Sequence, residues 1–171
     1  MGADSVPVMP ETSPLSSQPP RFWALVPCAG TGSRAATVVP KQYQPVAGQP
    51  LVLHTLAAFA AVNRLAATWV VVAPGDRFLT LDDDSKVALK RCGGTSRAES
   101  VRNGLQALLQ SGAEEADWVR VHDAARCLVT PEQMNALIDA CVDDDVGGLL
   151  ALQLPDTLKA ETGGRVSATL D

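Results

Sequence analysis

The sequence predicts an α/β fold in which a mainly parallel sheet carries helices on both faces. Short apolar runs typical of buried strands alternate along the chain with segments whose apolar residues recur at helical spacing. Alternating strands and helices favour parallel pairing with right-handed crossovers, so we expect a Rossmann-like sheet whose strand ends converge. The expected strands are Phe22–Pro27, Thr68–Ala73, Val87–Arg91, Trp118–Val121 and Gly147–Gln153.

Helices are expected between these strands. Residues Leu51–Val62 follow a proline and place apolar side chains at roughly helical spacing. Ser96 and Glu99 are spaced as a capping box, which predicts a helix start before a run with a buried apolar stripe. Thr130 and Pro131 predict a further start, because a capping residue followed by proline at the first helical position is typical of helix N-termini.

The chain has 171 residues and a formal net charge of −5. This length predicts one domain, which we place at 21–171, and we expect the Ser- and Pro-rich residues 1–20 to be a disordered extension. The acidic balance argues against a general nucleic-acid binder, and no apolar run is long enough to span a membrane. The four cysteines have no metal-binding spacing with either histidine, so we expect free thiols and a cytoplasmic protein.

A loop with glycines and nearby cations follows the first expected strand. It reads Cys28-Ala29-Gly30-Thr31-Gly32, and Arg34 and Lys41 come shortly after it. Glycines let backbone N–H groups approach a phosphate closely, and consecutive amides in such a loop can form an anion-binding concavity. The two cations would add full positive charges. The loop therefore predicts a polyphosphate site at the carboxyl end of the first strand.

Two other kinds of glycine loop fit less well. The Walker pattern needs Gly-Lys-Ser/Thr at its end, which is absent. Gly30, Gly32 and Ala35 match the dinucleotide fingerprint, but that motif should open a helix and be followed by an acidic residue about 20 positions later. Prolines interrupt the region after the glycines, and no Asp or Glu occurs between Gly30 and Asp76. A dinucleotide site is therefore disfavoured.

The same loop resembles a known family. The pattern P-x-A-G-x-G-x-R followed by P-K-Q-Y is similar to that of the 2-C-methyl-D-erythritol 4-phosphate cytidylyltransferases of isoprenoid synthesis. Three later motifs agree with this family and occur in its order: Gly93-Gly94 with Arg97–Val101, then Val121–Arg126, then Asp156–Lys159. Together the motifs cover the chain from Phe22 to Asp171, and their joint occurrence is far more specific than any one of them.

The resemblance implies a nucleotidyltransferase fold and transfer of a cytidylyl group from CTP to methylerythritol phosphate, with release of pyrophosphate and Mg²⁺ as cofactor. It implies catalytic roles for Arg34 and Lys41, which would stabilise charge around the α-phosphate. Asp123 would orient Mg²⁺ or a ribose hydroxyl, and Asp123, Arg126 and Thr157 would belong to the acceptor site. The implied nucleotide-binding residues are Cys28, Ala29, Gly30, Thr31, Gly32, Gly93, Gly94, Thr95 and Ser100.

The chain departs from the family pattern in three places. Thr95 stands where the family often has Asp, and Cys127 stands where it commonly has Pro. The sequence ends at Asp171, whereas family members continue, so we expect the acceptor site to be incomplete here. The resemblance also implies a projecting arm near Pro155–Asp171 that pairs two subunits, hence a homodimer of the full-length protein. The alternatives are a cytidylyltransferase for another polyol phosphate, such as ribitol 5-phosphate, and a non-catalytic nucleotide-binding module.

Overall fold

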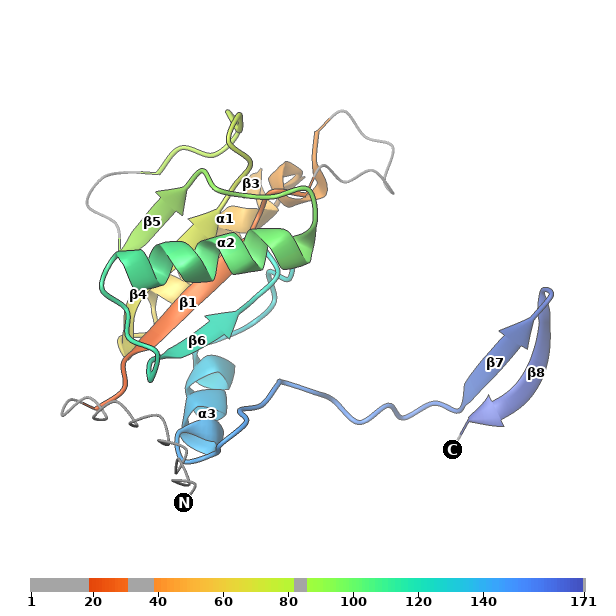
Figure 1. Cartoon of the computed structure of the whole chain (residues 1–171). Helices are drawn as coiled ribbons and strands as arrows, with labels where there is room; N and C mark the ends of the chain where they lie inside the picture. Colours follow the sequence, from red (N-terminus) through yellow and green to blue (C-terminus); the bar gives the residue numbers. More distant parts are fainter. Residues whose placement is uncertain (1–18, 31–38, 82–85, 171) are drawn as a thin grey trace, which may run out of the picture. The chain divides into compact units, whose positions relative to one another are not determined.

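A computed structural model of the chain describes residues 19–30, 39–81 and 86–170 (Figure 1). The chain divides into two compact units, one ending at Pro131 and the other beginning at Glu132. The first unit holds the parallel sheet, and the second holds a helix and a hairpin. In the described residues, none of the helices has the length and apolar character needed to cross a membrane.

A parallel sheet of four strands forms the centre of the first unit. Its strands are β1 (Phe22–Pro27), β4 (Leu65–Val71), β5 (Val87–Lys90) and β6 (Trp118–Val121), in the spatial order β5-β4-β1-β6. The predictions for these four strands and for their parallel pairing are confirmed. The chain builds the sheet outward from β1 to β5 and then returns to place β6 on the other side of β1. This reversal of strand order puts a topological switch point between β1 and β6, where open α/β sheets usually bind ligands.

Helices cover both faces of this sheet, as predicted. Helix α1 (Leu51–Ala60) packs on one face and α2 (Arg97–Gln110) on the other (Figure 1). Successive side chains of β1 point to opposite faces of the sheet. Val26 belongs to the core cluster that contains residues of α1, and Leu25 belongs to the cluster that contains residues of α2. A Cβ on Gly104 of α2 would lie 2.7 Å from a methyl carbon of Leu25, so this glycine lets α2 approach the sheet closely.

A short irregular region connects the glycine loop to α1. It contains a 3₁₀ turn, η1 (Lys41–Tyr43), and a small hairpin of β2 (Pro45–Val46) and β3 (Gln49–Pro50). Ala47 and Gly48 link the two strands with φ angles of 48° and 88°, the left-handed geometry that a tight two-residue hairpin turn requires. The described part of this region, 39–50, contains no α-helix, which agrees with the interruption expected from its prolines.

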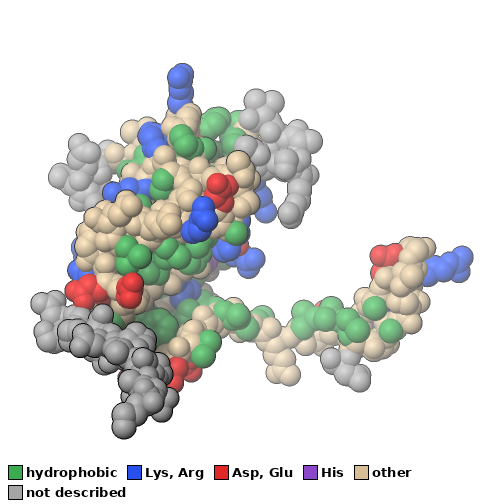
Figure 2. All heavy atoms as spheres, in the orientation of Figure 1, with side chains coloured by type: hydrophobic (Ala, Val, Ile, Leu, Met, Phe, Trp, Pro, Cys, Tyr) green, Lys and Arg blue, Asp and Glu red, His purple; other side chains and the backbone are tan. Residues whose placement is uncertain are grey.

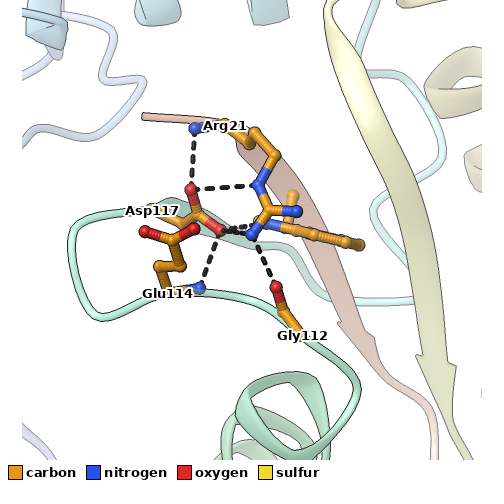
Figure 3. A network of polar contacts seen from close by, with 5 residues as sticks. Arg21, Gly112, Glu114 and Asp117 are labelled. Atoms are coloured by element: carbon orange, nitrogen blue, oxygen red, sulfur yellow. Dashed lines mark hydrogen bonds and ion pairs between the residues drawn. The ribbon is translucent and has the colours of Figure 1, made fainter. Parts of the chain in front are cut away.

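A buried carboxylate joins the amino ends of β1 and β6, at the edge of the sheet away from the glycine loop (Figure 3). Asp117 accepts hydrogen bonds from the backbone N–H of Arg21 at 2.8 Å, the indole N–H of Trp23 at 2.9 Å and the backbone N–H of Glu114 at 2.9 Å. The guanidinium of Arg21 pairs with the same carboxylate at 2.8 Å and also donates to the carbonyl oxygen of Gly112. Burial by itself would raise the pKa of Asp117, but these donors outweigh it and hold the pKa at about 2.

The second unit contains a helix and a two-stranded hairpin. Helix α3 (Pro131–Cys141) begins with proline at its first position, as predicted. Strands β7 (Leu158–Thr162) and β8 (Arg165–Leu170) pair antiparallel. Gly163 and Gly164 form their turn with φ angles of 61° and 76°. This hairpin occupies the segment in which the sequence predicted an arm.

The predicted strand at Gly147–Gln153 is wrong. The structure shows these residues without regular secondary structure, and no described segment pairs with them. Gly147 has a φ of 93°, which departs from extended geometry, while Leu149 and Leu152 are 77% and 93% exposed. A run of apolar residues becomes a strand only where a neighbouring backbone satisfies its N–H and C=O groups. Apolar side chains are exposed on the segment between α3 and the hairpin (Figure 2).

Candidate active site

Two of the segments predicted to bind the nucleotide lie against each other at the carboxyl edge of the sheet. Cys28 continues β1 and donates its backbone N–H to the carbonyl oxygen of Val71 at 2.7 Å, while the N–H of Gly93 bonds the carbonyl oxygen of Val72 at 2.8 Å. A Cβ on Gly93 would overlap the Cβ of Ala29 and would lie 2.8 Å from the Val72 oxygen. Only glycine therefore allows the loop after β5 to come this close to the glycine loop.

Ser100 holds the backbone of the Gly93-Gly94 loop by a hydrogen bond. Its hydroxyl accepts a hydrogen bond from the N–H of Gly94 at 3.0 Å and donates to the carbonyl oxygen of Ser96 at 2.9 Å. Only 2% of Ser100 is exposed. The hydroxyl is thus committed to holding the loop, so its contribution to a bound nucleotide would be made through the position of Gly94.

The predicted helix cap at the start of α2 is confirmed, with one difference in detail. The Ser96 hydroxyl accepts from the N–H of Glu99 at 3.1 Å, which is the cap bond. The Glu99 carboxylate accepts hydrogen bonds from the side chain of Thr95 at 2.8 Å and from the backbone N–H of Thr95 at 2.7 Å. In a capping box the donor would be the backbone N–H of the cap residue itself, Ser96. These bonds from Thr95 lower the pKa of Glu99. The side chain of Thr95 is therefore engaged with Glu99.

Lys41 lies on η1, beside the start of the glycine loop. Its neighbour Gln42 is 8% exposed and donates its amide N–H groups to the carbonyl oxygens of Cys28 at 3.1 Å and Gly30 at 2.8 Å. Lys41 itself is exposed. Thr31, Gly32 and Arg34 lie outside the described residues. Sequence reasoning missed Gln42; the signal that could have found it is its place inside the P-K-Q-Y motif.

A buried chain of polar groups supports η1 from its other side. The hydroxyl of Tyr43 donates to a carboxylate oxygen of Asp76 at 2.7 Å and lies 3.5 Å from the sulfur of Cys28. The Tyr43 ring also stacks on Phe78, with ring centroids 5.0 Å apart. Burial raises the pKa of the Cys28 thiol to about 11, so this thiol stays protonated at neutral pH. All four cysteines are free, as predicted.

Cys28 was predicted to bind the nucleotide, and the structure shows its groups engaged within the protein. Its side chain is 2% exposed, its N–H bonds Val71 and its carbonyl oxygen accepts from Gln42. Ala29 and Gly30, which follow it, are less buried. The described part of the loop that could meet a ligand is therefore Ala29 and Gly30.

Asp123, which follows β6 at the carboxyl edge of the sheet, binds two arginines. One of its carboxylate oxygens accepts from the Nε of Arg97 at 2.8 Å, and the other accepts from the Nε of Arg126 at 2.9 Å. Burial would raise the pKa of Asp123, but the two guanidinium groups outweigh it and lower that pKa. Arg97 and Arg126 remain 60% and 76% exposed in their side chains. The arrangement therefore presents two oriented guanidinium groups to solvent.

The turn that carries Arg126 is fixed by His122. Its Nε2 lies 2.9 Å from the carbonyl oxygen of Arg126, and its ring packs against Phe59 with centroids 5.3 Å apart. Burial lowers the pKa of His122, so the neutral imidazole is favoured. Sequence reasoning gave no separate role to Arg97 or His122, although both lie inside the motifs that carried the resemblance.

Asp123 is the candidate magnesium ligand among the described residues. No group of three or more His, Cys, Asp or Glu side chains in the ranges described is placed to hold a metal. Both carboxylate oxygens of Asp123 accept from arginine. The remaining acceptor candidate, Thr157, is exposed and directly precedes β7 in the second unit.

The approach of Gly93 to Ala29 and the ion pair of Arg97 with Asp123 bring three motif segments together at the carboxyl edge of the sheet. Comparison with known families matches residues 22–171 to the family described as IspD, 2-C-methyl-D-erythritol 4-phosphate cytidylyltransferase. The chain belongs to this family.

Two relatives are similar to this chain over most of the chain's length. A bifunctional enzyme IspD/IspF of Albidiferax ferrireducens is 62% identical over 164 residues, which cover 95% of this chain and 39% of the relative. A 2-C-methyl-D-erythritol 4-phosphate cytidylyltransferase of Burkholderia multivorans is 50% identical over 151 residues, covering 85% of this chain and 62% of the relative. The chain thus spans less than two thirds of the length of these relatives.

Solved structures agree with the fold. A crystal structure of 4-diphosphocytidyl-2C-methyl-D-erythritol synthase matches with a TM-score of 0.74 and 35% identity, over 89% of this chain and 68% of that one. The crystal structure of the Francisella tularensis 2-C-methyl-D-erythritol 4-phosphate cytidylyltransferase matches with a TM-score of 0.71 and 28% identity, over 88% of this chain and 66% of that one. The predicted nucleotidyltransferase-type α/β fold is confirmed.

Proposed function

We propose that the protein to which this chain belongs transfers the cytidylyl group of CTP to 2-C-methyl-D-erythritol 4-phosphate and releases pyrophosphate, in non-mevalonate isoprenoid synthesis. Family membership supports the proposal. The structural observation that carries it is the close approach of Gly93 to Ala29 beside the Lys41 turn. This approach joins the loop proposed for the phosphates to the loop proposed for the nucleoside.

The proposed reaction is an in-line displacement at phosphorus. A phosphate oxygen of the acceptor attacks the α-phosphorus of CTP, a new P–O bond forms, and the bond to the β-phosphate oxygen breaks as pyrophosphate leaves. Such reactions depend on positioning and charge stabilisation more than on a protein nucleophile. The protonated, buried thiol of Cys28 is consistent with this, because the mechanism assigns it no covalent role.

Each cation has a separate task in this mechanism. Lys41, together with Arg34, stabilises the negative charge that develops around the α-phosphate. Arg126 and Arg97, oriented by Asp123, bind the phosphate of the acceptor, because guanidinium groups recognise phosphate oxygens through paired hydrogen bonds. Asp123 thus acts as a positioning residue for two arginines.

Two further parts of the proposal concern cofactor and assembly. Magnesium would accompany the triphosphate of CTP, because this ion commonly binds substrate phosphates. We also propose a homodimer of the full-length protein. The hairpin of β7 and β8 supports it, since it occupies the segment where the family resemblance implies a dimerisation arm.

The experiment that tests the function is a pyrophosphate-release assay on the full-length protein. CTP, ATP and GTP are each supplied with methylerythritol phosphate, with ribitol 5-phosphate, or with no acceptor. We expect release with CTP and methylerythritol phosphate only. Faster release with ribitol 5-phosphate would assign another acceptor. Binding of CTP without release for any acceptor would favour a non-catalytic nucleotide-binding module.

A further inference from the structure

Gln42 ties the Lys41 turn directly to the backbone of the glycine loop. Its side-chain amide donates to the carbonyl oxygens of Cys28 and Gly30, at 3.1 Å and 2.8 Å. These two oxygens lie on alternate residues of the loop, at the start of its exposed part. Gln42 is only 8% exposed, and its bond to Cys28 is buried.

This pair of bonds suits a primary amide. Its nitrogen carries two N–H donors, so the amide of glutamine can satisfy two carbonyl oxygens at once without introducing a charge. Loss of the donors would leave the carbonyl oxygen of the buried Cys28 without this partner, which is costly. The glutamine is therefore matched in chemistry to the loop it holds.

The bonds also set where Lys41 lies. Lys41 and Gln42 are adjacent in η1, a turn of only three residues closed by backbone bonds from Tyr43 to Pro40 and from Gln44 to Lys41. Tyr43 fixes the other side of the turn through its bond to Asp76 at 2.7 Å. A short turn held on both sides moves as a unit, so a change at Gln42 shifts the backbone that carries the Lys41 ammonium.

We propose that Gln42 is a positioning residue, which sets the Lys41 ammonium relative to the phosphate-binding loop by bonding the carbonyl oxygens of Cys28 and Gly30. The inference rests on the proposed function, because it takes Lys41 to act at the α-phosphate. Gln42 does not touch the reacting atoms and acts through its neighbour. A displacement of about 1 Å at a catalytic group can lower a rate by roughly 10²-fold, so small changes at Gln42 have large effects on turnover.

The first test is the variant Gln42→Glu in the full-length protein. The ionised carboxylate would face two carbonyl oxygens in a largely buried position, which raises the pKa of the new acid above its usual value. The protonated acid regains one O–H donor. We expect the turnover number at pH 8 to fall by about 10- to 100-fold, and the ratio of variant to wild-type turnover to rise as the pH is lowered toward 6.

Gln106→Glu is the matched control, because it makes the same change of charge at an exposed position of α2. Its turnover relative to wild type should stay constant over the same pH range. A pH-independent ratio for Gln42→Glu, equal to that of the control, would overturn the proposal. A role limited to shaping the loop would instead raise the KM for CTP and leave turnover unchanged, which would also overturn it.

The second test is a double-mutant cycle on turnover at saturating CTP, with Gln42→Met, Lys41→Ala and the double variant. If Gln42 acts through Lys41, the double variant should be about as slow as Lys41→Ala alone. Multiplication of the two single effects would overturn the inference while leaving the proposed function in place. Full turnover by Lys41→Ala would remove both the catalytic role of Lys41 and the inference. Unfolding of both Gln42 variants, followed by circular dichroism, would assign Gln42 to stability and overturn the positioning role.

Discussion

Gly93 lies so close to Ala29 that a methyl group on Gly93 would overlap the Cβ of Ala29. The two residues are far apart in sequence, and each follows a different strand of the sheet. Their contact joins the loop proposed for the phosphates to the loop proposed for the nucleoside. The geometry of the proposed nucleotide site therefore depends on the absence of a side chain at Gly93.

Gly93→Ala tests this contact. The added Cβ meets the Cβ of Ala29 and the carbonyl oxygen of Val72, neither of which is the end of a flexible side chain. We expect a loss of about 1–3 kcal/mol in the free energy of unfolding, measured in urea, and a raised KM for CTP. Gly75→Ala is the control, because no described heavy atom lies within 4 Å of a Cβ there. Equal behaviour of the two variants would contradict the role of the contact.

The strands of the sheet could be predicted because each is a strong apolar run between loop residues, and their parallel order follows from the intervening helices. Gly147–Gln153 has the same local pattern but lacks a pairing partner among the described segments, and a partner is not a property of local sequence. The candidate site could be placed at the carboxyl edge of the sheet, because the ends of parallel strands converge there once the sheet itself is predicted. The bonds of Gln42 and the two ion pairs of Asp123 could not be predicted from the sequence. They depend on the directions of side chains, which residue spacing does not specify.

Lys41→Ala tests the proposed electrostatic role. An ammonium placed for the transition state stabilises it more than it stabilises bound CTP. We expect the turnover number to fall by roughly 10²- to 10³-fold, while CTP affinity measured by calorimetry changes only modestly. Lys86→Ala, an exposed lysine beside the amino end of β5, is the control and should keep wild-type turnover. A turnover number of folded Lys41→Ala within about threefold of wild type would exclude Lys41 from the mechanism.

Arg126→Ala tests the acceptor phosphate site. The variant removes one of the two guanidinium groups that Asp123 orients and leaves Arg97 in place. Loss of a charge-assisted contact typically costs about 1.5–3 kcal/mol, so we expect a raised KM for methylerythritol phosphate and little change in the KM for CTP. Arg102→Ala, an exposed arginine of α2, is the comparison and should affect neither constant. A larger effect of Arg126→Ala on CTP than on the acceptor would contradict the assignment.

The buried carboxylate of Asp117 predicts how stability depends on acid. Its folded-state pKa of about 2 lies below the ordinary value of 3.8 that applies when the chain is unfolded. Between these values the unfolded state binds more protons, so the stability that this group contributes is present above about pH 3.8 and is lost as the pH falls toward 2. The contribution at neutral pH is about 2 kcal/mol, from about 1.4 kcal/mol for each pKa unit.

Asp117→Asn removes this dependence. Asparagine cannot titrate, and it turns an N–H₂ group toward the donors of Arg21, Trp23 and Glu114, so we expect a loss of about 1–3 kcal/mol at pH 7. Urea unfolding of wild type and variant at pH 7, 4 and 3 measures both effects, and the two stabilities should converge as the pH falls. Glu115→Gln, an exposed neighbour, is the control and should follow wild type. A constant difference between Asp117→Asn and wild type across this range would show that the carboxylate is not held ionised by these donors.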